Sequence, residues 1–135
     1  MTEESKKQPE KREGKPAKVE QGKSQRNPHL LTKTVSWPQE NVGDCSQLNA
    51  TLVFESDGSG VFSCSTWTNH TVFGDTWHST FVVYDANNVR LFILGEWDSP
   101  SMNVGHTPGI GWSYQFKFPA AQFEAIASVT QNFSC

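Results

Sequence analysis

The chain of 135 residues contains only three cysteines, and their spacing is not that of a metal site. Cys45, Cys64 and Cys135 include no C-x-x-C pair, which argues against structural zinc. An oxidising compartment would allow one disulfide and one free thiol, whereas a reducing one would leave three thiols. Cys45 precedes the first strong strand and Cys135 ends the sequence, so these two are the expected disulfide. Cys64 lies among apolar strand residues and is expected in the core.

Long apolar segments are also missing. No stretch approaches the roughly 18 uninterrupted apolar residues that a membrane-spanning helix needs. No apolar run follows the N-terminal lysines, so a classical signal peptide is not expected. We therefore expect a soluble protein, either cytoplasmic or exported by a non-classical route, that is a monomer or a weak dimer.

The first 26 residues contain no aromatic side chain and few apolar ones. Residues 1–30 carry a net charge of +3, and the remaining residues carry −6. Such a segment buries too little apolar surface to offset its chain entropy. The sequence therefore predicts a disordered basic tail over residues 1–30 and one folded domain over residues 31–135. Five glutamates within the tail favour a solubilising linker over a nucleic-acid-binding arm.

The folded part shows apolar residues at period two, separated by turn residues. This pattern predicts strands over residues 31–37, 50–56, 60–67, 76–85, 89–97, 110–118 and 128–133. Pro119 and the alanines after it predict a short helix over residues 119–127. We therefore expect an all-β fold, an antiparallel β-barrel or β-sandwich of six to seven strands with one short C-terminal helix.

The predicted hairpin of residues 76–97 is apolar on both faces. A two-residue turn at Asn87 and Asn88 would set Asp85 opposite Arg90, and His78 opposite Trp97. Phe81 and Leu94 would then lie on one face, and Val82 and Ile93 on the other. A hairpin with two apolar faces needs two covering layers, and the predicted helix is a candidate for the second.

Asp75, His78 and Ser79 are the residue types of a catalytic triad. Neighbouring residues of a strand point to opposite faces, so His78 and Ser79 should diverge. No G-x-S-x-G motif supports a hydrolase. The histidines lack H-x-H or H-E-x-x-H spacing, and Glu96 with Asp98 is typical of an exposed acidic strand end. No catalytic residue, metal or cofactor is therefore expected.

Aromatic residues are plentiful, and five of them are tryptophans. Rings beside polar groups are typical of a surface that binds a protein or a carbohydrate. Side-by-side hairpins would gather such a rim from Trp67, His70, Phe73, Trp77, Trp97, Asp98 and His106. The competing interpretation is that the tryptophans fill the core.

The sequence thus favours a non-catalytic binding or interaction module for a protein or carbohydrate ligand, and a nucleic-acid partner is not expected. The charge of −6 raises an alternative, an acidic immunity or inhibitor protein that neutralises a basic partner. A second alternative is a small hydrolase or toxin-like effector that uses His78 or His106.

Three segments carry a resemblance: "GDC" at Gly43–Cys45, then "ATLVFESDGSGVFSC" and "FVVYDANNVRLF". Over about residues 42–92 the chain resembles small bacterial β-domains of unknown function. The resemblance implies an antiparallel fold and assigns no site residue.

Overall fold

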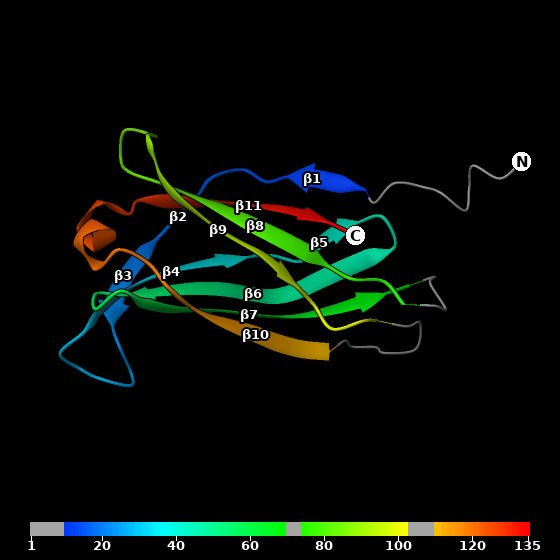
Figure 1. Ribbon diagram of the computed structural model, residues 1–135, viewed down its shortest axis with the longest axis horizontal. Coiled ribbons are helices and arrows are strands. Elements are labelled where there is room, and N and C mark those ends of the chain that lie inside the picture. The colour runs from blue at the N-terminus through cyan, green and yellow to red at the C-terminus, as the bar shows by residue number, and fades with distance from the viewer. Residues whose placement is uncertain (1–9, 70–73, 103–109) are drawn as a thin grey trace, which may run out of the picture.

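A computed structural model describes residues 10–69, 74–102 and 110–135, in which antiparallel strands form two sheets (Figure 1). The first sheet has the order β1 (Lys11–Glu13), β11 (Ser128–Ser134), β8 (His78–Tyr84) and β9 (Arg90–Asp98), and β2 (Ala17–Lys18) also pairs with β11. The second has the order β10 (Ile110–Lys117), β7 (Ser59–Thr68), β6 (Cys45–Glu55), β4 (Leu31–Trp37) and β3 (Glu20–Lys23), and β5 (Glu40–Val42) pairs with β6. The all-β prediction is confirmed. The barrel alternative is wrong, because each sheet keeps its own edges and the two stack as a sandwich.

The hairpin of β6 and β7 has the predicted inward face. Leu52, Phe54, Phe62 and Cys64 are all buried. The loop between paired Phe54 and Gly60 contains an odd number of residues, so the inward positions of the two strands coincide. Burial raises the pKa of the Cys64 thiol, which packs as a small apolar side chain.

The hairpin of β8 and β9 departs from the predicted register. Val82 pairs with Ile93 as predicted, but a bulge further along sets His78 opposite Asp98 and not opposite Trp97. A bulge places two residues of one strand opposite one residue of its partner, so every later pairing shifts.

The outer face of this hairpin is only partly covered. Ile93 is 51% exposed, while Phe81 and Leu94 on the inner face are buried. Near the turn, Tyr84 pairs with Arg90, which replaces the predicted pairing of Asp85 with Arg90. The short C-terminal helix does not cover this outer face, because its large apolar side chain lies in the core between the sheets.

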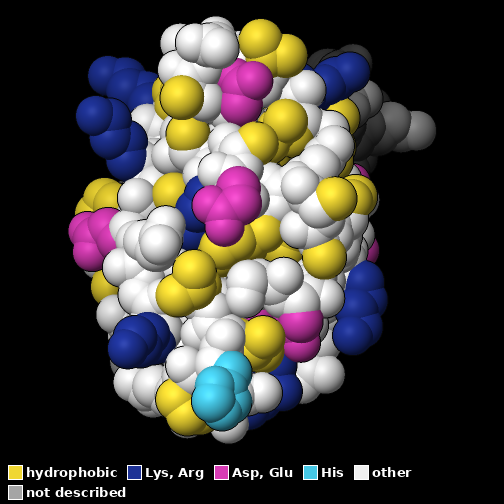
Figure 2. Space-filling model, turned by 90° about the vertical axis from the view of Figure 1, so that its left-hand side faces the viewer, with side chains coloured by type: hydrophobic (Ala, Val, Ile, Leu, Met, Phe, Trp, Pro, Cys, Tyr) yellow, Lys and Arg dark blue, Asp and Glu magenta, His cyan; other side chains and the backbone are white. Residues whose placement is uncertain are grey.

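That helix is the 3₁₀ element η2 (Ala120–Ala125), and not an α-helix. Its Phe123, with Ile126 just after it, is buried in the core between the sheets. The element lies at the left-hand end of the sandwich in Figure 1, and seen from that end the hydrophobic side chains appear in small groups among polar atoms (Figure 2). The element closes an end of the core.

Lys33 reaches η2 from β4. Its Nζ donates hydrogen bonds to the carbonyl oxygens of Phe123, Glu124 and Ile126 at 2.9, 2.9 and 2.8 Å. The residue is 6% exposed, and burial lowers the pKa of its ammonium group. The ammonium supplies donors to carbonyls at the end of the short helix, and that of Phe123 also accepts the Ile126 amide N–H at 3.2 Å.

A second buried polar contact joins the two sheets. Gln47 and Gln131 exchange hydrogen bonds between their side-chain amides at 3.0 and 2.7 Å, and both residues are fully buried. Gln131 Nε2 also donates to Ser79 Oγ at 3.0 Å.

The predicted tail is not confirmed as disordered where the structure describes it, from residue 10 to residue 30. β1 and β2 pair with β11, and β3 pairs with β4. Their side chains are mostly exposed, so backbone pairing on the two open sheet edges holds the segment, which an argument from side-chain composition does not detect. Residues 1–9 lie outside the described residues. None of the described helices is long and apolar enough to cross a membrane.

Candidate functional site

An aromatic edge lies where the last strands of the two sheets approach each other. We define it as Trp97 of β9 with Trp112, Tyr114 and Phe116 of β10. The Trp97 and Tyr114 rings stack with centroids 5.7 Å apart at 8°, and Trp97 lies 5.1 Å from Phe116. Because β9 and β10 end different sheets, these rings close the open side of the sandwich.

The aromatic edge runs from the core to the surface. On the inner side, the Trp97 ring lies 5.4 Å from Phe81. Trp112 is half-buried, and its Nε1 donates to Thr66 Oγ1 at 2.9 Å. Tyr114 is 38% exposed, so part of its ring faces solvent. Trp112, Tyr114 and Phe116 occupy alternate positions of β10, so period two places their rings on one face, but the sequence gave no sign that Trp97 would join them.

The predicted rim is not assembled as a unit by the described residues. Trp67 is half-buried between buried Thr66 and Thr68, so it faces the outer side of its sheet. Trp97 packs between the sheets, away from that side. His70, Phe73 and His106 lie outside the described residues.

Trp77 is fully buried and was wrongly assigned to the rim. Its ring stacks on Phe133 at 5.1 Å, and its Nε1 donates to Ser79 Oγ at 2.9 Å. Met102 and Val42 complete this second, smaller core. Trp77 directly precedes β8 and therefore lies at one end of the sandwich, where its ring fills the space between the sheets.

His78 and Ser79 diverge, as predicted. Ser79 is 1% exposed and is bonded to Trp77 and Gln131 inside the sandwich. The His78 side chain turns outward, where its Nδ1 lies 2.7 Å from Asp98 Oδ1 and 2.9 Å from Glu96 Oε2. Asp98 therefore belongs to a polar cluster on the outer face and not to the aromatic edge.

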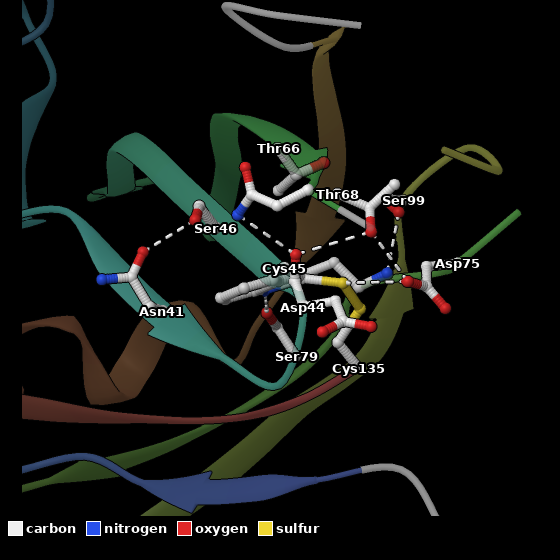
Figure 3. The surroundings of a disulfide bond; sticks show 12 residues. Asn41, Asp44, Cys45, Ser46, Thr66, Thr68, Asp75, Ser79, Ser99 and Cys135 are labelled. Carbon is white, nitrogen blue, oxygen red and sulfur yellow. Dashed lines mark hydrogen bonds between the residues drawn. A yellow bond between two sulfur atoms is a disulfide. The ribbon is translucent and has the colours of Figure 1, made fainter. Parts of the chain in front are cut away.

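The end of the sandwich that contains Trp77 also holds a disulfide between Cys45 and Cys135, the expected pair (Figure 3). It joins the start of β6 in one sheet to the residue after β11 in the other, with a Cα–Cα distance of 6.2 Å. Asp75 lies beside it and accepts a hydrogen bond from Thr68 Oγ1 at 2.9 Å. This places the Asp75 carboxylate away from His78 and Ser79, so these three residues form no triad.

The opposite end carries an ionic cluster that the sequence did not reveal. Glu55 accepts a hydrogen bond from Ser24 Oγ at 2.6 Å and pairs with Arg26, which also lies 3.6 Å from Asp57. The Ser24 hydroxyl, followed by Arg26, lowers the pKa of Glu55. These residues line a hollow of about 950 Å³ that also includes Lys117. Since Ser24 and Arg26 belong to the predicted tail, no local sequence pattern indicated the contact.

The region from residue 51 to residue 135 matches a family described as a family of unknown function (DUF6294). The match confirms the resemblance to a domain of unknown function. It includes β7 to β11, and with them the whole aromatic edge. No curated protein and no solved structure matches the chain. Because the match extends over more than half of its length, the chain belongs to this family, DUF6294.

Proposed function

We propose that this protein is a non-catalytic binding module that takes an extended peptide segment of a protein partner along β10. The observation that carries the proposal is the exposed edge of β10. This strand ends its sheet and pairs with β7 over its whole length without a bulge. The stretch Ile110–Phe116 contains no charged residue and no proline.

Natural sheets protect their edges with charges, prolines and bulges, because unpaired backbone groups invite another strand. The edge strand β9 follows this rule, with a bulge and with Arg90, Glu96 and Asp98. The edge strand β3 carries Glu20 and Lys23. In the part of the chain that the structure describes, β10 thus stands out as a long edge that carries no charge until its last residue, Lys117.

The aromatic edge supports the same proposal. Strand addition takes its affinity from backbone hydrogen bonds and its specificity from neighbouring side chains. Tyr114, exposed on β10 and stacked on Trp97, would contact alternate side chains of an added strand. Rigid rings supply contact area at a low cost in conformational entropy.

The test uses an array of immobilised peptides of about ten residues, probed with the full-length protein. We expect bound sequences to be extended and apolar, and Tyr114→Ser to weaken binding at least about tenfold, the loss typical of an aromatic hot spot. Val89→Ser is the matched control, since Val89 is 57% exposed at the far turn of the β8–β9 hairpin and its substitution should leave binding unchanged.

Hydrogen exchange then distinguishes strand addition from other contacts. An added strand would slow exchange of the amides of Ile110–Lys117 that face away from β7. Equal binding by wild-type protein and Tyr114→Ser, or no slowing in β10, would refute the proposal. Binding to a glycan array with no binding to any peptide would assign the aromatic edge to carbohydrate instead.

A further inference from the structure

Three potential metal ligands converge on the outer face of the first sheet, outside the aromatic edge. His78 comes from β8, and Glu96 and Asp98 come from β9. The His78 Nδ1 atom lies 2.7 Å from Asp98 Oδ1 and 2.9 Å from Glu96 Oε2. One ligand atom of each residue lies within 4.8 Å of the others. An ion at their centre could reach all three side chains with small rotations.

The β-bulge creates this convergence. Thr80 pairs with Gly95 and Ser79 pairs with Trp97, so Glu96 is the extra residue without a partner on β8. His78 pairs with Asp98 in the next position. Bulges redirect side chains at strand ends, and this one aims two carboxylates at one imidazole.

Apart from the His78 imidazole, which is charged only when protonated, no cation lies beside these two carboxylates among the residues that the structure describes. Within that part of the chain, Glu96 and Asp98 form ion pairs with His78 alone, and neither carboxylate has a Lys or Arg nitrogen within 4 Å. Glu55 and Asp57, by contrast, share Arg26. Two like charges facing a single nitrogen repel each other unless positive charge is added.

The surroundings leave room for an ion with its water. The Glu96 and Asp98 side chains are 52% and 49% exposed. An adjacent hollow of about 410 Å³ is lined by His78, Glu96 and polar side chains that could hold water ligands, namely Thr80, Asn132 and Ser134. Lys11 and Arg12 also line it, but neither pairs with Glu96 or Asp98.

We propose that His78, Glu96 and Asp98 bind a divalent transition-metal ion of the zinc type. One imidazole and two carboxylates are a donor set that zinc accepts, with three protein ligands and the remaining positions open to water or to another donor. Calcium and magnesium prefer sites made only of oxygen, so the imidazole argues against them. The ion would link β8 to β9 at the sandwich edge.

The experiment is calorimetric titration of the metal-free, full-length protein with zinc chloride, and with magnesium chloride as the second probe. We expect one zinc ion per chain, at least a tenfold weaker affinity in His78→Gln and in Asp98→Asn, and no heat with magnesium. His29→Gln is the matched control, because His29 is exposed and lies outside the three-residue cluster. This variant should bind zinc like wild-type protein.

Far-UV circular dichroism of each variant shows whether a loss of zinc binding comes from unfolding of the protein. Cobalt substitution adds a readout, because coordination by His78 would change the visible absorption of Co²⁺ in wild-type protein and not in His78→Gln. Equal zinc affinity in His78→Gln and wild-type protein, or no zinc binding by either, would overturn the proposal. None of these results bears on peptide binding at β10, so the two proposals can fail separately.

Discussion

The two ends of the sandwich are closed by different chemistry. One end is joined covalently by Cys45 and Cys135 over the ring of Trp77. The other is closed by the ammonium group of Lys33 under η2, with the Glu55 cluster nearby. Both devices tie parts of the chain that are distant in sequence. The comparison shows that the same demand, closing an open end of a small core, can be met by a bond that responds to reductant or by charges that respond to pH.

Removing the disulfide is the largest change expected. The double variant Cys45→Ala, Cys135→Ala opens a link between residues 90 positions apart, and a loop of that length corresponds to about 4.6 kcal/mol of unfolding free energy. Urea unfolding of oxidised protein, compared with the variant, measures the loss. Dithiothreitol should destabilise wild-type protein by a similar amount and leave the variant unchanged. A loss below about 1 kcal/mol would mean that the covalent end contributes little to stability.

Removing the ammonium group tests the other end. Lys33→Met keeps the aliphatic stem but removes one donor from three carbonyl oxygens, of which that of Phe123 keeps the Ile126 amide, so we expect a loss of about 2–3 kcal/mol. Exposed Lys18 offers the matched control, since Lys18→Met should change stability little. Thermal unfolding followed by circular dichroism measures both variants. Equal melting temperatures for the two would show that η2 is held by its apolar contacts alone.

The smallest effect concerns pH. The lowered pKa of Glu55 means that its stabilising contribution is present above the ordinary carboxyl pKa and is lost as pH falls through the lowered value. Glu55→Gln should therefore cost about 1 kcal/mol at pH 7 and flatten the decline of stability in acid. Unfolding in urea between pH 2.5 and pH 7 measures this slope. An unchanged slope would assign the acid sensitivity to other carboxylates.

Much of the fold could be predicted from alternation and turn residues. The strand Leu31–Trp37 and the inward set of β6 and β7 were expected because a strand repeats every two residues. Bulges were not, since the extra residue shifts the phase of that period at a position that no particular residue type marks. The shift near Glu96 changed the partner of His78, and with it the composition of the outer-face cluster.

The candidate site was harder to predict, because ring exposure depends on which strands end the sheets. Trp77 and Trp97 are alike in sequence, each beside a loop, yet one is fully buried and the other lies at an open side. The helix prediction failed for a related reason. Phe123 and Ile126 reach the core from a 3₁₀ turn and the residue after it, and not from an α-helix.

The reciprocal amide pair of Gln47 and Gln131 limits how the two layers can be stacked. Two sheets that met only through apolar side chains could slide slightly over each other, because each lost apolar contact would be replaced by another of similar free energy. The two amides can bond each other only when β6 and β11 lie in their present relative position. Shifting one sheet over the other by the width of a strand would leave both amides buried without hydrogen-bond partners. The pair thus favours one relative position of the two sheets over others that would be equally compact.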